Sequence, residues 1–520
     1  MTSLLIFLKY RSVQWRTEMV LFDFLKETPP ARVGLYIIGH PHYWDQFKGL
    51  HDRLIDYGDF IEEKMSRWGE VYNFGMVDTE KTAQRAGEWF NEKNVDILFC
   101  YSATYAMSGS HIIIPQICKK PVVVLNLQPA EQINYKETIT GEWLAHCGAC
   151  AVPEISNAYQ RCGIEFHVVT GLLGLEKTPE ISLTDEVTAG HPDAIAAWKE
   201  IREWIKAAAV KRTLQFGRMG FLGHTYPGML DLYSDFTMVT GQTGMHVEVM
   251  EMCDLDRLFE TVREEEIAAK LEQIKEMFIL SEDSPADPLA RRPTEKQLNW
   301  SARVAVAQQK LVEEFDLDAL TYYYRGAGGN KYENLQAGFI VGNSLLTAQG
   351  IPCAGEGDMK TALAMKICDT LGIGGSFCEI VVTDFKDQTI LLGHDGPFHI
   401  GIADRKPVLR GMGLYHGKWG AGVSVEAKVK TGPITNLGIT QTKDGRLKMV
   451  ASQGMATDGE VMQIGNTMTP VQFALTPREF MNKWFSVGPT HHFAMSVGHN
   501  ASLLGKVAEI LDVSFEVISV

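Results

Sequence analysis

The chain has 520 residues, of which 45% are apolar and 22% are charged, a balance typical of a globular protein. At roughly 150 residues per domain, this length suggests about two to four domains, and it allows a large core without disulfide bonds. The net charge of −15 disfavours nucleic acids and anionic membranes as partners, because both need clustered lysine and arginine. No stretch reaches the roughly 18 consecutive apolar residues that would cross a membrane.

The nine cysteines are odd in number and scattered, and they lie mostly in apolar runs. This pattern is typical of reduced, buried thiols, so we expect a cytoplasmic protein. Cys147-Gly-Ala-Cys150 forms a single CxxC motif. Such a motif can serve redox chemistry or bind zinc, but without a second pair a structural role is the simpler interpretation.

Residues 1–30 are expected to form an N-terminal extension. Their short apolar patch comes before Lys9 and Arg11, whereas a secretory signal places positive charge ahead of a longer apolar run. From residue 31 the pattern changes to alternating apolar strands and amphipathic helices. An N-terminal α/β domain is therefore predicted over residues 31–205, with βαβ units and a parallel sheet.

Three short apolar runs indicate buried parallel strands in this domain, at residues 33–38, 95–100 and 121–126. An amphipathic stretch at 44–63 indicates a helix. Polar turns at 39–42 and 101–104 follow the first two strands. Ligands of open α/β sheets bind at the carboxyl ends of strands, so both turns are candidate substrate contacts, although ordinary loops have the same composition.

A central α/β domain is predicted over residues 206–374, and a β-rich domain over residues 375–520. The central domain begins near a glycine-rich strand at 216–225. The β-rich domain contains short segments with frequent glycine, which indicate an antiparallel sheet or small barrel; they lie at 378–383, 389–392, 423–429 and 432–441. The fold class is therefore α/β, with two Rossmann-like α/β/α domains followed by an antiparallel, barrel-like domain.

Glu356 is the first candidate for chemistry. It stands between Gly355 and Gly357, just before an amphipathic stretch at 361–371, so its carboxylate is expected on a tight turn with little steric cover. The alternative is that Asp358 caps the following helix and Glu356 is merely exposed to solvent. Glu379 precedes a β-branched strand, where a glutamate is usually a surface residue, and it gains weight only as a partner of Glu356.

Histidines supply the other candidate ligands. His394 and His399 lie on one turn with Asp395 between them, and His491 and His492 form a pair after a proline. Neighbouring side chains of an extended segment face opposite ways, so one imidazole of the pair is expected to enter a site. Two glutamates with one or two histidines suit Mn²⁺, Mg²⁺ or Co²⁺ better than structural zinc, which recruits thiolates.

These elements together resemble the superfamily of L-arabinose isomerase and L-fucose isomerase. The resemblance is clearest to L-arabinose isomerases, in the order and spacing of four segments: Gly355-Glu-Gly-Asp-x-Lys-Thr-Ala362, Ser376-Phe-x-Glu379, the Leu-Gly turn before His394, and Pro489-x-His-His492. Weaker similarity extends the match over nearly the whole chain after residue 30.

The resemblance implies a metal ion, Mn²⁺ or another divalent cation, bound by Glu356, Glu379, His394 and His492. It also implies a homo-oligomer, a hexamer or an assembly of trimers, with sites at subunit contacts. His146 matches a substrate-contacting histidine that the neighbouring subunit supplies in that family, and His42 is the corresponding candidate after the first strand.

Two segments depart from the family pattern. The third element is shorter, so that alignment of its Leu-Gly places Asp395 opposite the family's ligand; His394 is our choice and His399 its substitute. The turn after the first strand is Gly39-His-Pro-His42, without the glutamine that could contact sugar hydroxyls. The identity of the sugar is therefore left open.

The resulting functional hypothesis is a metal-dependent aldose–ketose isomerase that acts on an open-chain sugar through an enediol intermediate. Glu356 and Glu379 are its expected catalytic residues, one taking the carbon-bound proton and the other moving the hydroxyl proton. Which of them is the base stays open. The alternatives are a metal-dependent epimerase or lyase on a sugar derivative, and a non-catalytic sugar-binding protein.

Overall fold

The computed structural model describes residues 12–15, 18–21, 26–283, 286–326, 329–395, 397–412, 414–415, 418–419 and 422–519. The chain forms two compact units: an N-terminal unit, Pro29–Arg212, and a C-terminal unit, Thr213–Val520 together with Met1–Thr28. Residues 1–11 of the expected N-terminal extension lie outside the described part, and the strands β1 (Ser12–Trp15) and β2 (Glu18–Leu21) form an antiparallel pair.

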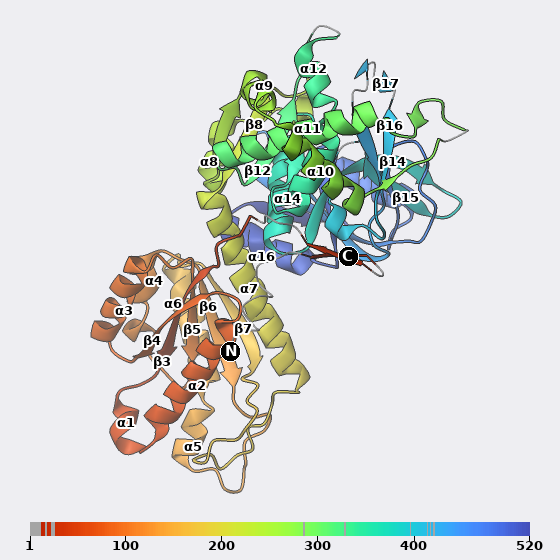
Figure 1. Cartoon of the computed structure of the whole chain (residues 1–520). Coiled ribbons are helices and arrows are strands. Elements are labelled where there is room, and N and C mark those ends of the chain that lie inside the picture. The colour runs from red at the N-terminus through yellow and green to blue at the C-terminus, as the bar shows by residue number, and fades with distance from the viewer. Residues whose placement is uncertain are drawn as a thin grey trace. The chain divides into compact units, whose positions relative to one another are not determined.

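The N-terminal unit contains a five-stranded parallel sheet in the order β4-β3-β5-β6-β7 (Figure 1). Its strands are β3 (Arg32–Ile38), β4 (Glu70–Val77), β5 (Ile97–Ser102), β6 (Val122–Gln128) and β7 (Phe166–Leu172). The three predicted strands are confirmed as β3, β5 and β6, which are almost wholly buried. The chain order reverses between β3 and β5, the position where open α/β sheets usually bind ligands.

Helices cover this sheet. They are α1 (His42–Gln46), α2 (Leu50–Met65), α3 (Glu80–Glu92), α4 (Ile113–Cys118), α5 (Thr140–Ala145), α6 (Val152–Arg161) and α7 (Pro192–Phe216). The helix predicted at 44–63 is divided into α1, which ends at Gln46, and α2, whose N-cap is Gly49 with a left-handed φ of 83°.

The first layer of the C-terminal unit is a four-stranded parallel sheet in the order β13-β12-β8-β9. Its strands are β8 (Arg218–Gly223), β9 (His246–Met250), β12 (Ala319–Tyr323) and β13 (Cys353–Ala354). The accompanying helices are α8 (Phe236–Thr243), α9 (Met252–Glu260), α10 (Glu264–Met277), α11 (Glu295–Glu314), α12 (Lys331–Gln336), α13 (Phe339–Ala348) and α14 (Met359–Thr370).

Helix α14 differs from the expected amphipathic helix, because its residues from Met359 to Asp369 are all buried. It packs on the parallel sheet through β12 and β13 and on the antiparallel strands β14, β20 and β23 described next. Its lysines are buried with polar partners: Lys360 donates to the Ser234 hydroxyl at 2.7 Å and Lys366 to the carbonyl of Gly350 at 2.9 Å. Local hydrophobic periodicity could not reveal a helix that is covered on both sides.

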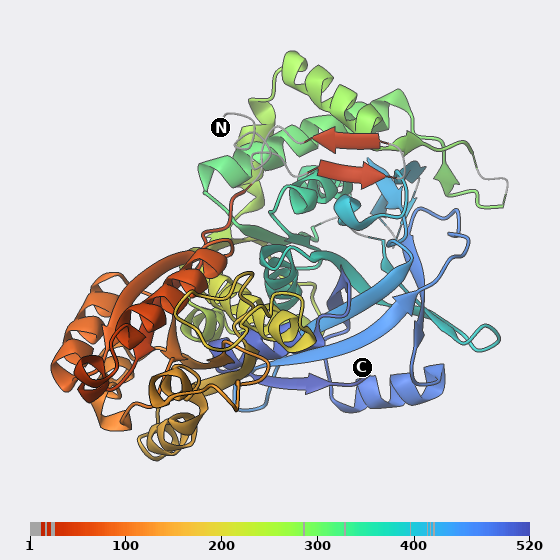
Figure 2. The same cartoon turned by 90° about the horizontal axis from the view of Figure 1, so that it is seen from below.

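The second layer is a closed antiparallel barrel of six strands, in the order β20-β23-β14-β15-β22-β21, in which β21 pairs back onto β20. Its strands are β14 (Gly374–Asp384), β15 (Thr389–His394), β20 (Gly432–Gln441), β21 (Leu447–Ala456), β22 (Thr467–Phe473) and β23 (His492–Val497). Figure 2 shows the long blue strands of this layer. The parallel sheets and this barrel confirm the predicted fold class.

Smaller elements complete the C-terminal unit. Strand β24 (Ser514–Val517) adds to β21 in parallel, and the helices α15 (Pro477–Ser486) and α16 (Ala501–Leu511) accompany the barrel. A separate sheet contains β10 (Ile279–Leu280), β11 (Ala290–Arg291), β16 (Val408–Met412) and β19 (Val423–Glu426), and β17 (Leu414–Tyr415) pairs with β18 (Lys418–Trp419). Within the described residues, no helix has the length and apolarity required of a membrane span.

Candidate metal and catalytic site

Glu356 lies on the turn between β13 and α14, at the carboxyl end of the parallel sheet. Its backbone is left-handed, with a φ of 62°, and Gly357 follows with a φ of 70°. A Cβ atom at Gly357 would lie 2.6 Å from the carbonyl oxygen of His224, so the turn needs glycine there. The Glu356 carbonyl accepts a hydrogen bond of 2.9 Å from the Tyr226 amide, which holds the turn against the loop after β8.

The barrel register brings the other candidates together. Glu379 pairs with His492 across β14 and β23, and with Gly393, the neighbour of His394, across β14 and β15. Directly opposed residues of antiparallel strands share one face of the sheet. The expectation that Glu379 stands at a strand entry is wrong, because β14 begins at Gly374 and places Glu379 in its interior.

Two overlapping groups of side chains could hold a metal ion. Their ligand atoms lie within 4.8 Å of one another in each group; the first contains Glu356, His491 and His492, and the second Glu379, His394 and His492. The Nε2 atom of His492 is 3.6 Å from Glu356 Oε2, and the Nε2 atom of His394 is 4.0 Å from Glu379 Oε1. The structure therefore assembles Glu356, Glu379, His394 and His492 around one another.

His399 lies apart from these two groups. It is buried, and its backbone amide donates to the Ser376 hydroxyl at 3.2 Å. His394 ends strand β15, and its Nδ1 atom lies 2.9 Å from Asp395 Oδ1. Burial opposes the charged imidazole, but the hydrogen bond and charge of Asp395 raise the pKa of His394 overall.

Asp358 orients His492. The imidazole is fully buried, and its Nδ1 atom is 3.0 Å from Asp358 Oδ2. Burial raises the pKa of the Asp358 carboxyl, but the contact with His492 outweighs burial, and the pKa lies below its usual value overall. The group is therefore a carboxylate, which accepts the hydrogen bond that Nδ1 donates. The Nε2 lone pair of His492 is then directed at Glu356. Sequence reasoning recognised Asp358 only as a helix cap, a role it also fills by accepting from the Thr361 amide at 3.0 Å.

Asp231 orients His491 in a similar way. Its Oδ2 atom lies 2.7 Å from His491 Nδ1 and accepts from the His491 amide at 3.0 Å. The Nε2 atom of His491 lies 3.8 Å from Glu356 Oε2. Both imidazoles of the pair lie near Glu356, because β23 starts at His492 and strand alternation does not extend to His491.

The charges at the site reinforce one another. Burial lowers the pKa of His491, but the nearby carboxylates of Glu356 and Asp231 outweigh burial and raise the pKa to about 9. Burial raises the pKa of Glu356, and the contacts with His491, His492 and His394 bring it below its usual value. Burial lowers the pKa of His492, which favours the neutral imidazole that binds metals.

The donor set fits a divalent cation. Glu356 Oε2 and His492 Nε2 are buried and have no hydrogen-bond partner. A buried polar atom without a partner costs free energy, and a bound cation would satisfy both atoms at once. The second carboxylate and the second imidazole complete a mixed oxygen and nitrogen environment of the kind that Mn²⁺ and similar ions accept.

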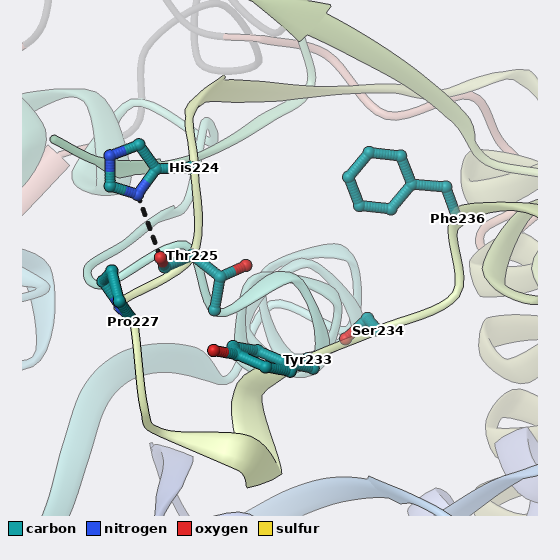
Figure 3. A pocket seen from close by; sticks show the side chains of 6 residues that line it. All are labelled: His224, Thr225, Pro227, Tyr233, Ser234 and Phe236. Carbon is teal, nitrogen blue, oxygen red and sulfur yellow. Dashed lines mark hydrogen bonds between the residues drawn. The ribbon is translucent and has the colours of Figure 1, made fainter.

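A cavity of about 570 Å³ lies beside this site, lined by His224, Thr225, Pro227, Tyr233, Ser234 and Phe236. Figure 3 shows these side chains along the loop that follows β8, with the His224 imidazole bonded to the Thr225 carbonyl. The same loop carries Asp231 and contacts the Glu356 turn through Tyr226. The cavity thus has aromatic and hydroxyl-bearing walls next to the metal-binding groups.

His146 and His42 belong to the N-terminal unit. His42 is exposed and begins α1 directly after β3. His146 is buried at the end of α5, where its Nδ1 atom lies 2.9 Å from the Glu142 carbonyl and its Nε2 atom 3.7 Å from Glu186 Oε1. Glu142, His146 and Glu186 also form a metal-competent group, but the guanidinium of Arg53 already pairs with both carboxylates.

The geometry defines an α/β protein with a carboxylate–imidazole cluster at the carboxyl edge of a parallel sheet and on the adjoining barrel. Residues 235–374 match the family model of the L-arabinose isomerase central domain. An L-arabinose isomerase from Serratia proteamaculans is 23% identical over 344 residues, which cover 64% of this chain and 66% of the relative. One from Saccharophagus degradans is 25% identical over 352 residues, with 64% and 66% covered.

A third L-arabinose isomerase, from Herpetosiphon aurantiacus, is 25% identical over 368 residues and 68% of both chains. The chain is thus similar at low identity to L-arabinose isomerases, and it aligns with about two thirds of their length. A periplasmic solute-binding protein from Actinobacillus succinogenes with bound D-allose aligns over 62% of this chain and 77% of its own at 10% identity, with a TM-score of 0.16.

Proposed function

We propose that the protein is a metal-dependent aldose–ketose isomerase that acts on an open-chain sugar through an enediol intermediate. The observation that carries the proposal is the convergence of two carboxylates and two imidazoles in which Glu356 Oε2 and His492 Nε2 are buried without partners. The names of the relatives agree with this activity. The match of residues 235–374 includes Glu356.

Glu356, Glu379, His394 and His492 would hold the cation, with Mn²⁺ proposed first and Mg²⁺ or Co²⁺ as substitutes. When bound, the cation supplies Lewis acidity and fixes two neighbouring oxygens of the sugar. Asp358 keeps His492 in the tautomer that presents Nε2, because its carboxylate accepts from Nδ1. Such support keeps the ligands in place before the substrate arrives.

The two glutamates are the proposed acid–base pair. Interconversion of an aldose and a 2-ketose moves one proton between C2 and C1 and another between the two oxygens. One carboxylate takes the carbon-bound proton and the other carries the hydroxyl proton, a contribution of about 10² to 10⁴ in rate. Either glutamate could be the base. The cavity beside Tyr233 and Ser234 has space for the rest of the sugar.

We further propose a homo-oligomer, trimer-based or hexameric, in the cytoplasm. In this proposal His146 and His42 of one subunit contact the sugar bound by another. Their support is the resemblance to the isomerase family and, for His42, a position after β3 at the carboxyl end of the sheet of the N-terminal unit.

The test is a ketose-formation assay on protein stripped of metal with a chelator. Pentoses, hexoses and 6-deoxyhexoses are offered with and without Mn²⁺. Ketose formation that Mn²⁺ restores is the expected result, and it would also name the sugar. Tight Mn²⁺ binding without turnover of any sugar would contradict the isomerase and favour an epimerase or lyase on a sugar derivative; absence of Mn²⁺ binding would contradict the metal site itself.

A further inference from the structure

Cys147 and Cys150 lie side by side in the N-terminal unit. Their Sγ atoms are 2.9 Å apart, and the Cys150 thiol also lies 2.7 Å from the Cys147 carbonyl. A disulfide bond measures roughly 2.05 Å, so the two sulfur atoms need to approach by only about 0.9 Å to bond. The fold therefore holds the two sulfur atoms within reach of one another.

The turn that carries the pair is anchored to the sheet. It connects α5 to α6, and Gly148 within it packs so tightly that a Cβ atom would lie 2.0 Å from the Ser102 carbonyl at the end of β5. The Ser102 hydroxyl donates to the Gly148 carbonyl at 2.9 Å, and this hydroxyl is buried. Both cysteines are thus fixed by the backbone between them rather than by their own side chains.

The two thiols differ in access. Cys150 is exposed, whereas Cys147 is buried. Burial, and next the contact with Cys150, raise the pKa of the Cys147 thiol to about 12, so Cys147 does not start an exchange reaction as a thiolate. Of the remaining cysteines, Cys162 and Cys253 are exposed and the other five are buried.

We propose that Cys147 and Cys150 are a reversible dithiol–disulfide pair that exchanges with low-molecular-weight disulfides such as oxidised glutathione. Cys150 loses its proton to solvent and attacks one sulfur of the reagent, which releases one glutathione thiolate. Cys147 then attacks the Cys150 sulfur as its proton passes to the departing sulfur, which releases the second glutathione as a thiol. Two protein thiols are oxidised to one disulfide, and one glutathione disulfide is reduced to two thiols.

The cysteine pair lies next to His146, a proposed substrate contact, so its oxidation would affect that residue. His146 immediately precedes Cys147, and its backbone amide bonds to the Trp143 carbonyl at 3.0 Å within the same turn. Burial and the charges of both thiols raise the pKa of Tyr43, which is one residue after His42. The disulfide would therefore tighten the turn that begins at His146.

The test uses the full chain in glutathione buffers of increasing oxidised fraction, with an acid quench, alkylation of free thiols and peptide mass spectrometry. The expected product is a Cys147–Cys150 linked peptide, with both thiols lost together and regained on reduction. A pair that stays free at every buffer ratio, or a wild-type protein that accumulates glutathione on Cys150, would overturn the proposal. This readout needs no variant, so it stands even if a substitution unfolds the chain.

Two variants separate the roles of the thiols. Cys147→Ser removes the resolving thiol, so about tenfold more Cys150 than in wild type should remain bound to glutathione. Cys150→Ser should leave Cys147 unmodified, and Cys162→Ser, at another exposed cysteine, should leave the linked peptide unchanged. Equal adduct on Cys150 in wild type and Cys147→Ser would show that Cys147 does not resolve the mixed disulfide and would contradict the proposal.

Discussion

Asp358 does two things with one carboxylate: it caps α14 and it fixes the imidazole of His492. The substitution Asp358→Ser separates these roles, because serine is a good N-cap but is too short to reach His492. We expect the helix cap to be kept, His492 Nδ1 to lose its partner, and Mn²⁺ affinity to fall by about 10- to 100-fold, the usual effect of losing such a supporting group. Isothermal titration calorimetry on metal-free protein measures this.

The matched control for that variant is Asp235→Ser. Asp235 caps α8 by accepting from the Met238 amide at 3.1 Å and is exposed. The control should lose no Mn²⁺ affinity. An unchanged affinity in Asp358→Ser, with a clear loss of stability, would mean that Asp358 is only a cap.

His491 offers a prediction on pH. Its pKa is raised to about 9, although burial opposes this, because Glu356 and Asp231 favour the charged imidazole. In metal-free protein, the stabilisation from this contact is fully present below the ordinary histidine pKa of about 6.5 and is lost as the pH rises through about 9. Asp231→Asn should move the His491 pKa toward its ordinary value, which an NMR titration of the imidazole protons records; an unchanged pKa would contradict the contact.

At the scale of elements, the turn between β13 and α14 depends on Gly357. Gly357→Ala places a Cβ atom 2.6 Å from the His224 carbonyl and 2.6 Å from the Thr225 Cα, on a backbone with a φ of 70°. We expect a lower melting temperature and weaker Mn²⁺ binding, because the turn must shift and move Glu356 with it.

Gly372→Ala is the control for this backbone effect. Gly372 has a similar φ of 73°, but a Cβ atom there meets nothing within 4 Å. The control therefore loses only about 1 to 2 kcal/mol of left-handed strain. Equal losses of unfolding free energy in the two variants would refute the steric argument at Gly357.

Much of the fold was visible in local sequence. The runs at 33–38, 95–100 and 121–126 are continuous and apolar, because the strands they form are covered on both faces of a parallel sheet. Strand β13 has only two residues, which is too short for any periodicity to show. The barrel also needs pairings between strands far apart in the chain, such as β14 with β23, which the β-rich segments did not specify.

Part of the site could also be predicted from local sequence patterns. Glycines beside Glu356 and the His491–His492 pair are local signals, and they indicated candidate ligands. The contacts of Asp358 with His492 and of Asp231 with His491 join residues 134 and 260 positions apart. No local pattern connects such residues, so their orienting roles emerged only from the packing of α14 and β23 and of the loop after β8.

At the scale of the whole molecule, the two compact units contain different buried charge networks. In the N-terminal unit Arg53 bonds to Glu142 at 2.6 Å, to Tyr57 at 2.7 Å and to Glu186. Arg53→Leu leaves two buried carboxylates without a counter-charge, so we expect a loss of about 3 to 5 kcal/mol in unfolding free energy. Denaturant unfolding followed by circular dichroism measures it.

The control is Arg67→Leu, since Arg67 pairs with Glu63 at 3.3 Å on the surface with side-chain exposures of 62% and 76%. Such a pair contributes about 0 to 1 kcal/mol. If Arg53→Leu is as mild as this control, the buried network does not stabilise the N-terminal unit.

Within the C-terminal unit, Glu356 stands on the parallel sheet, whereas Glu379, His394 and His492 stand on the barrel. A cation held by all four residues would bridge two layers that already meet through α14 and through the contact of Asp358 with His492. It would then behave as a removable cross-link, and the protein would become harder to unfold as the free cation concentration rises above its dissociation constant. The ion that would activate a sugar would therefore also raise the thermal stability of the fold.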